Sequence, residues 1–345
     1  MKLNYVKSLC LLCLFFTLPA QSQINHPADR YAEREDVKAF IDEMVTEYRY
    51  ERATLDALFH FTQPIPSVLK AIRPPADPGI RSWRTYRSRF VEPVRIAAGK
   101  KFMQRYATEL AAAEARFGVP ADIIAAIIGV ETIYGKHTGS YTTFSALTTL
   151  AFDYPPRAKL FRQELIELLL LAREENRPIL SYTGSYAGAL GLPQFMPSSR
   201  RKYALDFDND GKIDLATSPA DAIGSAANFL AEHGWEKDGP IAQPVTVSGD
   251  GIQALLDEGI TPQRRPSEFA ARQVQIQKVG AGDTAANGQL SDQPAALIDL
   301  VTPDAPTEYR LGYRNFYVIT RYNRSSFYAA AVMDLADALK KSAAF

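Results

Sequence analysis

The spacing of apolar residues predicts a chain made mainly of helices. Over 36–70, apolar side chains recur at every third or fourth position, which is the period of a helix with one buried face. A proline-rich segment at 74–79 interrupts the pattern. A second run covers 91–117 and stops at Gly118, a residue type that commonly caps helix C-termini. The densest apolar helix is predicted over 120–134, where the leading proline suits a first helical turn.

The period changes after residue 240. Helices joined by loops are expected up to that point, whereas alternating apolar and polar residues at 245–247 and 273–276 predict strands. We therefore expect a mainly α (α+β) fold. Its expected parts are an N-terminal helical subdomain (23–90), a helical core (91–240), a small β-rich insert (241–302) and a C-terminal strand and helix that return to the core (303–345).

A basic and then apolar N-terminus predicts a signal peptide over residues 1–22. Two lysines precede an apolar run, 8–18, that is too short to span a bilayer. The small residues Ala20 and Ser22 suit cleavage after Ser22. An N-terminal membrane anchor is the alternative interpretation of this segment.

Both cysteines lie inside the predicted signal peptide. Leu12 precedes Cys13, whereas a lipoprotein needs a small residue there, so we expect a soluble rather than a lipid-anchored protein. Without residues 1–22 the chain has no disulfide, no thiol nucleophile and no cysteine-ligated metal. The four histidines lack the spacing of zinc ligands. Catalysis is therefore expected to depend on carboxylates.

Composition excludes further classes of protein. The chain of 345 residues has 39 basic and 39 acidic side chains, so it carries no electrostatic footprint for nucleic acid. A hydrophobic fraction of 46% excludes a disordered chain. At this length, two or three packed subdomains are expected instead of one core.

One carboxylate lies on the apolar face of the predicted helix over 120–134. Ile124, Ile127 and Ile128 precede Glu131 by seven, four and three residues, which places the four side chains on one face. Burial raises the pKa of a carboxyl group, so a glutamate at this position can stay protonated near neutral pH and act as a general acid. A core glutamate held by an arginine or a backbone donor is the alternative.

Two motifs surround and follow this glutamate. The segments 129–135 (GVETIYG) and 184–199 (GSYAGALGLPQFMPSS) resemble those of the B-type lytic murein transglycosylases. The likeness runs from about residue 36 to the C-terminus. It implies a lysozyme-like helical core over 91–240, in which Glu131 is the single catalytic acid and base.

The resemblance also implies a reaction. Glu131 would protonate the oxygen between N-acetylmuramic acid (MurNAc) and N-acetylglucosamine (GlcNAc) in peptidoglycan, with the 2-acetamido group assisting. It would then deprotonate the C6 hydroxyl of the same sugar, which closes a 1,6-anhydro ring without water. Most glycosidases use two carboxylates, and Asp153 is a candidate for a second one. A muramidase that uses water and a noncatalytic, calcium-bound wall-binding protein are the alternative functions.

Candidate sugar contacts lie in the second motif and near the C-terminus. Its glycines leave little side-chain bulk, so the backbone can approach a ligand, although a tight helix crossing is the alternative. For Tyr322 and Tyr328, near the C-terminus, the alternative is an ordinary place in the aromatic core. Where the family often has two successive basic residues for contact with a peptide or lactyl carboxylate, this chain has only Arg157. The resemblance implies substrate binding by Arg157, Ser185, Gln194, Phe195, Tyr322, Asn323 and Tyr328.

An acidic loop begins at Asp206. The sequence DFDNDGKID matches the first nine positions of an EF-hand loop, with oxygen ligands at positions 1, 3, 5 and 9, glycine at 6 and a backbone carbonyl at 7. Position 12 is Thr217 instead of glutamate. Asp221, where the family has an aspartate, could complete the EF-hand-like loop 206–221, or could serve only as a charge at a helix N-terminus.

From this loop we expect a structural Ca²⁺, and we expect no organic cofactor. The alternative is a solvated acidic turn. The candidate ligands are Asp206, Asp208, Asp210, Lys212, Asp214 and Asp221.

The signal peptide and the resemblance together predict a periplasmic protein that acts on peptidoglycan glycan strands. We expect a monomer. Proteins of cell-wall synthesis or division are candidate partners, and nucleic acid is not.

Overall fold

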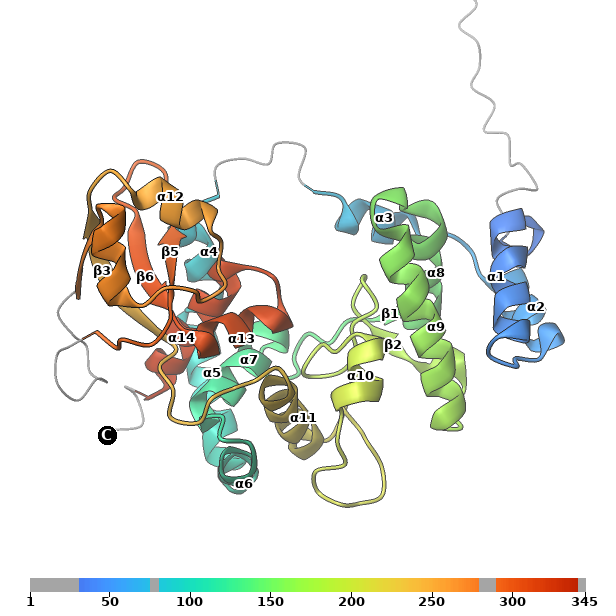
Figure 1. Cartoon of the computed structure of the whole chain (residues 1–345). Coiled ribbons are helices and arrows are strands. Elements are labelled where there is room, and N and C mark those ends of the chain that lie inside the picture. The colour runs from blue at the N-terminus through green and yellow to red at the C-terminus, as the bar shows by residue number, and fades with distance from the viewer. Residues whose placement is uncertain (1–30, 75–80, 279–289, 341–345) are drawn as a thin grey trace, which may run out of the picture. The chain divides into compact units, whose positions relative to one another are not determined.

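The computed structural model describes residues 31–74, 81–278 and 290–340 (Figure 1). The predicted signal peptide, 1–22, lies outside the described residues. The chain divides into two compact units, one that extends to Gln63 and one that begins at Pro64. Within the described ranges, no helix is both long enough and apolar enough to cross a membrane.

The smaller unit consists of a 3₁₀ turn (Tyr31–Glu33) and two packed helices, α1 (Glu35–Thr46) and α2 (Arg52–Phe61). Phe40 and Phe59 are fully buried, and their rings meet edge to face at a centroid distance of 5.7 Å. The segment predicted to be helical, 36–70, is thus helical but is divided among several helices.

The larger unit is mainly helical, which confirms the predicted fold class. A proline occupies the first turn of several of its helices, where its missing N–H leaves no hydrogen bond unmade. The helices are α3 (Pro66–Ile72), α4 (Trp83–Phe90), α5 (Pro93–Arg105), α6 (Ala107–Phe117), α7 (Ala121–Thr132), α8 (Thr143–Asp153), α9 (Ala158–Glu174), α10 (Pro197–Tyr203), α11 (Pro219–Glu232), α12 (Ile252–Asp257), α13 (Arg314–Tyr322) and α14 (Ser326–Lys340).

Helix α4 belongs to the larger unit, although it falls within the N-terminal subdomain predicted over 23–90. Trp83 is fully buried, and its ring lies 5.5 Å from that of Phe327 on α14. Its backbone N–H also donates to the carbonyl of Val301 at 2.7 Å. These contacts with the C-terminal part of the chain place α4 in the larger unit, which begins at Pro64.

Helix α7 is the densely apolar helix predicted over 120–134. It packs against α5, α6, α11 and α14, and most of its side chains are buried. Gly118, at the end of the preceding helix α6, caps that helix with a left-handed φ of 71°, as predicted. The run predicted over 91–117 is divided into α5 and α6 at Tyr106, where ψ of 34° departs from helical values.

A four-stranded antiparallel sheet forms the β-rich part, with strand order β4-β3-β6-β5 (Figure 1). Its inner strands pair with Val245 opposite Tyr309. Strand β6 lies beyond the insert predicted over 241–302, so the C-terminal segment completes the sheet before α13 begins. The strands are β3 (Ala242–Ser248), β4 (Gln275–Lys278), β5 (Ala296–Leu300) and β6 (Glu308–Gly312).

A second, two-stranded sheet lies within the helical part. It pairs β1 (Tyr141–Thr142) with β2 (Thr183–Gly184) in antiparallel register. This short ribbon joins the segment after α7 to the start of the glycine-rich motif.

Candidate active site

Glu131 lies in the last turn of α7, and the backbone turns sharply directly after it. Ile133, Tyr134 and Gly135 have φ values of 51°, 56° and 90°. Left-handed backbone is uncommon for residues other than glycine, and for a β-branched residue it is an outlier that surrounding structure must hold in place. Tertiary contacts therefore hold the end of α7 in this conformation.

The Glu131 carboxyl group is half-buried and has one tyrosine donor. Tyr328, on α14, donates its hydroxyl to Oε1 of Glu131 at 2.6 Å. Burial raises the pKa of Glu131 to about 7, although the hydrogen bond from Tyr328 acts in the opposite direction. A carboxyl group with this pKa can donate a proton near neutral pH and can take one back.

The charge of Glu131 acts on three tyrosines from separate helices. Burial, and then the charge of Glu131, raise the pKa values of Tyr86, Tyr322 and Tyr328. The rings of Tyr322 and Tyr328 stack at 6.4 Å. Sequence reasoning missed Tyr86, because nothing in the local pattern of α4 connects it with a residue 45 positions later.

Activity that depends on protonated Glu131 is expected to fall as the pH rises through about 7. Removing the Tyr328 hydroxyl removes a bond that stabilises the charged carboxylate, so the pKa of Glu131 rises further. Tyr328→Phe should therefore move the alkaline limb of kcat/KM to higher pH. A matched control is Tyr313→Phe, which removes another buried hydroxyl, bonded to Gln243, and should leave the limb in place. An unmoved limb in Tyr328→Phe would contradict the assignment.

Thr132 connects the end of α7 to the glycine-rich motif. Its fully buried hydroxyl lies 3.0 Å from the carbonyl oxygen of Leu192 and accepts from the N–H of Gly135 at 3.0 Å. Leu192 in turn donates its N–H to the carbonyl of Leu215 in the acidic loop at 2.7 Å. A single residue of the motif thus contacts both the end of α7 and the acidic loop.

The glycine-rich motif folds back on itself through two predicted sugar-binding side chains. Ser185 Oγ accepts from the N–H of Ala189 at 3.1 Å. Gln194 has a left-handed φ of 51°, and its Nε2 donates to the carbonyl of Gly191 at 2.8 Å. At Gly191 a side chain is sterically excluded, since a Cβ would lie 2.3 Å from the carbonyl oxygen of Leu215. Both polar side chains are half-buried, and sugar binding by them stays a prediction.

Phe195 does not offer its ring to a sugar in this structure. It is 2% exposed and packs against Tyr322 and Phe229 at centroid distances of 5.8 and 5.6 Å. The ring fills the core under the motif, and sugar binding by Phe195 stays a prediction. Tyr186, in the same motif and 38% exposed, is an aromatic side chain that sequence reasoning did not select.

The remaining predicted contacts differ in how the structure supports them. The hydroxyl of Tyr322 donates to the carbonyl of Pro193 at 2.7 Å. This hydrogen bond connects α13 to the glycine-rich motif. Asn323, directly after α13, is exposed. Arg157 is exposed, and its guanidinium lies over the ring of Phe161. The proposed roles of these last two residues, and of the half-buried Asp153 at the end of α8, stay predictions.

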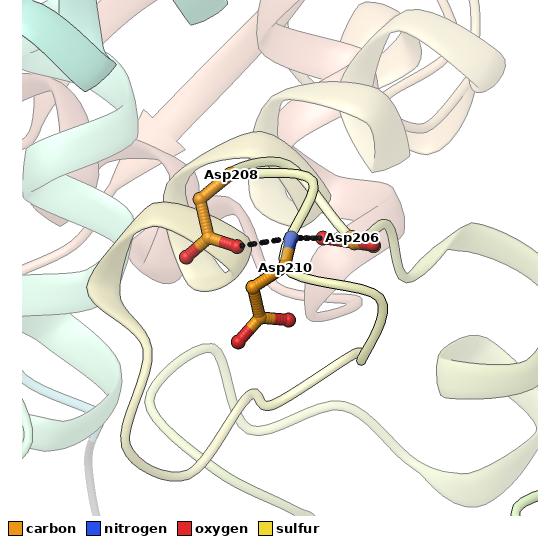
Figure 2. Close-up of side chains that lie close together, drawn as sticks. All are labelled: Asp206, Asp208 and Asp210. Carbon is orange, nitrogen blue, oxygen red and sulfur yellow. Dashed lines mark hydrogen bonds between the residues drawn. The ribbon is translucent and has the colours of Figure 1, made fainter.

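Three carboxylates of the acidic loop converge, as the EF-hand pattern predicts (Figure 2). One oxygen each from Asp206, Asp208 and Asp210 lies within 4.8 Å of the others. Two oxygens that share a calcium ion at about 2.4 Å lie at most about 5 Å apart. In Figure 2 the backbone N–H of Asp210 points at Asp206 and Asp208 and donates to both.

The buried carboxylate of Asp221 connects two parts of the acidic loop by hydrogen bonds. It is 1% exposed, and its two oxygens accept from the N–H of Phe207 at 2.8 Å and of Asp214 at 2.7 Å. Both ends of the loop are therefore tied to one carboxylate at the start of α11. The oxygens of Asp214 accept from the loop residues that follow it, including the N–H of Thr217 at 2.9 Å. Neither Asp214 nor Asp221 lies in the converging group, so their roles as ligands stay predictions. Lys212 donates its N–H to Asp210 at 2.9 Å.

Comparison with known proteins agrees with this geometry. A family model described as the transglycosylase SLT domain matches residues 32–337. Membrane-bound lytic murein transglycosylase B of Escherichia coli (strain K12) is 37% identical over 335 residues, which cover 94% of this chain and 88% of that protein. Soluble lytic transglycosylase SltB1 from Pseudomonas aeruginosa is 43% identical in sequence, and its crystal structure matches this one with a TM-score of 0.80. The match covers 90% of this chain and 100% of that one.

A calcium complex is known for a further relative. The Escherichia coli lytic transglycosylase Slt35, solved in complex with calcium, is 35% identical, with a TM-score of 0.75, and the match covers 92% of this chain and 98% of that one. These matches extend over nearly the whole chain, and they confirm the resemblance inferred from the two motifs. The chain belongs to the transglycosylase SLT domain family, among the lytic murein transglycosylases of the B type.

Proposed function

We propose that this protein is a lytic transglycosylase that cleaves the MurNAc-β-1,4-GlcNAc bond of peptidoglycan, with Glu131 as the single general acid and base. The observation that carries the proposal is the half-buried Glu131, whose pKa is raised to about 7 and whose Oε1 accepts from Tyr328. Family membership supports the same reaction.

In the first step, protonated Glu131 gives its proton to the glycosidic oxygen as the bond from C1 of MurNAc to that oxygen breaks. The 2-acetamido group of the same sugar assists at C1. The hydroxyl of Tyr328 stabilises the carboxylate that Glu131 becomes, because a hydrogen bond to the charged form favours it.

In the second step, the Glu131 carboxylate takes the proton of the C6 hydroxyl while O6 bonds to C1. The product carries a 1,6-anhydro-MurNAc end, and Glu131 is protonated again. No water is consumed, so one carboxyl group with a pKa near neutrality suffices for both steps.

Mass spectrometry of a murein digest tests the reaction. Transglycosylation gives anhydro-muropeptides that are one water lighter than the products of hydrolysis. A muramidase would give the heavier, reducing products. Murein that is bound and left uncut would indicate the noncatalytic wall-binding alternative, so each competing function has its own outcome.

The acidic loop 206–221 fits a structural Ca²⁺. We propose that Asp206, Asp208 and Asp210 hold it with their carboxylates, joined by the backbone carbonyl of Lys212 and by Asp214 and Asp221. The short separation of the first three carboxylates and the calcium complex of Slt35 support this. The ion would supply charge compensation to the loop and would take no part in bond cleavage.

Calcium is expected to raise the melting temperature of the purified protein, and a chelator is expected to lower it. At a hundred times its Kd, a ligand that binds only the folded state adds about 2.7 kcal/mol of stability. Asp208→Asn removes a converging charge and should abolish the calcium response. Asp250→Asn, a control outside this loop, should keep it. A melting temperature that does not respond to chelation would contradict the proposal.

The same proposal includes the compartment. Cleavage after Ser22 would release a soluble periplasmic monomer that acts on glycan strands, where proteins of cell-wall synthesis or division are candidate partners. N-terminal sequencing of the exported protein tests the cleavage site, and a retained residue 1 would support the membrane-anchor alternative.

A further inference from the structure

A buried guanidinium joins the helix that carries Glu131 to the helix that carries Tyr86. Arg95 lies on α5 and is 7% exposed. Its Nε donates to the carbonyl of Gly129 on α7 at 2.9 Å, and its Nη1 donates to the carbonyl of Arg89 on α4. One side chain therefore contacts two helices that approach the site from different parts of the sequence.

Both acceptors lie at helix C-termini. Gly129 is three residues from the end of α7 and Arg89 is one residue from the end of α4. The last turn of a helix carries the negative end of its dipole, so a cation placed between two such ends is favoured. The carbonyl of Gly129 also accepts from Ile133, the first residue of the left-handed turn after Glu131.

A carboxylate is only a secondary partner of this cation. The nearest one, Glu92, lies 3.8 Å from Nη1. Its oxygens accept from the backbone N–H groups of Val94 and Arg95 at 2.7 Å and thereby cap α5. The two helix carbonyls are thus the close partners of the guanidinium.

Packing beside Gly129 restricts movement of the α7 end. A Cβ at Gly129 would lie 2.4 Å from the hydroxyl oxygen of Tyr134, and one at Gly99 on α5 would lie 2.2 Å from it. The Tyr134 ring therefore rests directly on the backbones of α5 and α7. Arg95 and Tyr134 together hold the turn of α7 from which the Glu131 side chain projects.

We propose that Arg95 is a positioning residue for catalysis, which holds the end of α7 that carries Glu131 by joining it to the C-terminal end of α4. The inference rests on the proposed role of Glu131 as the acid and base. Arg95 itself is not placed in contact with the substrate.

Two variants test this role with a soluble fragment of MurNAc–GlcNAc repeats as substrate. Arg95→Met keeps an apolar stem over the Phe90 ring and removes every donor. Because a misplacement of about 1 Å can cost about a hundredfold in rate, kcat should fall by about tenfold to a hundredfold. KM should change by less than about threefold, since lost transition-state contacts act on kcat. Arg95→Lys keeps the positive charge and can still donate to one of the two carbonyls, so its kcat should lie between those of Arg95→Met and the wild type.

The pH profile separates positioning from stability. A displaced Glu131 loses part of the Tyr328 hydrogen bond, so the alkaline limb of Arg95→Met should move to higher pH, and that of Arg95→Lys should move less. Arg200→Met is a matched control, because Arg200 is also buried, at 5% exposed, and bonds to Glu175 and to the carbonyl of Ile213. It should lower the melting temperature and leave both the limb and kcat per folded molecule unchanged.

Arg95 variants with wild-type kcat and an unmoved limb would overturn the inference, whatever their melting temperature. If Arg95→Met does not fold, Arg95→Lys decides alone, and wild-type kcat in that variant overturns the inference equally. Failure of the proposed function has a different signature, which is full activity of a Glu131 variant.

Discussion

Glu131→Gln is expected to abolish cleavage of peptidoglycan. General acid or base catalysis contributes about 10²–10⁴-fold in rate, and here one carboxyl group performs both tasks, so the loss should reach the upper end of that range. Glutamine has nearly the same shape, and its amide oxygen can still accept from Tyr328. The release of anhydro-muropeptides from purified sacculi measures the effect.

The variant should still fold and bind murein. The folded state retains its proton on Glu131 up to a pH of about 7, whereas an unfolded glutamate loses it near its ordinary value of 4.5. Between these values the unfolded state binds fewer protons, so this group makes the wild-type protein less stable as the pH rises. Glu131→Gln lacks that penalty and should melt no lower than the wild type above pH 7. Undiminished lysis by the variant would refute the assignment.

Asp221→Ala is expected to lower the free energy of unfolding by about 3 kcal/mol or more. Two backbone N–H groups donate to this buried carboxylate, and a hydrogen bond to a charged group contributes about 1.5–3 kcal/mol. Alanine leaves both donors without their acceptor at the two ends of the acidic loop. Urea unfolding in the presence of a chelator measures this contribution apart from any cation.

Asp210→Asn is the matched control for this measurement. Asp210 is exposed, and its Oδ1 accepts from the N–H of Lys212, a bond that an asparagine oxygen can also accept. In chelator its unfolding free energy should stay within about 0.5 kcal/mol of the wild type, as for most surface changes. An equally small change in Asp221→Ala would show that the buried carboxylate does not brace the loop.

Features encoded in consecutive residues could be predicted from the sequence. The apolar face of α7 carries Glu131, the left-handed cap at Gly118 follows from its residue type, and the converging carboxylates follow from the spacing of Asp206, Asp208 and Asp210. In each case the helical period or the loop spacing alone brings the side chains together.

Features that depend on partners far away in the chain could not be predicted from the sequence. The side on which the Phe195 ring packs is decided by Tyr322 and Phe229, and α4 joins the larger unit because Trp83 is buried against Phe327. Arg95 has no motif at all, since its partners are backbone carbonyls, which every residue possesses. Contacts of this kind leave no residue-type signal for a single sequence to reveal.

Leu192 has a consequence for exchanging parts between related enzymes. Its N–H donates to the carbonyl of Leu215, and its own carbonyl lies 3.0 Å from the hydroxyl of Thr132, so three segments meet at one residue. A chimera that replaces the acidic loop must preserve the path of the backbone at Leu215, whatever side chains it brings. The loop, the glycine-rich motif and the end of α7 are therefore best transplanted as a single module.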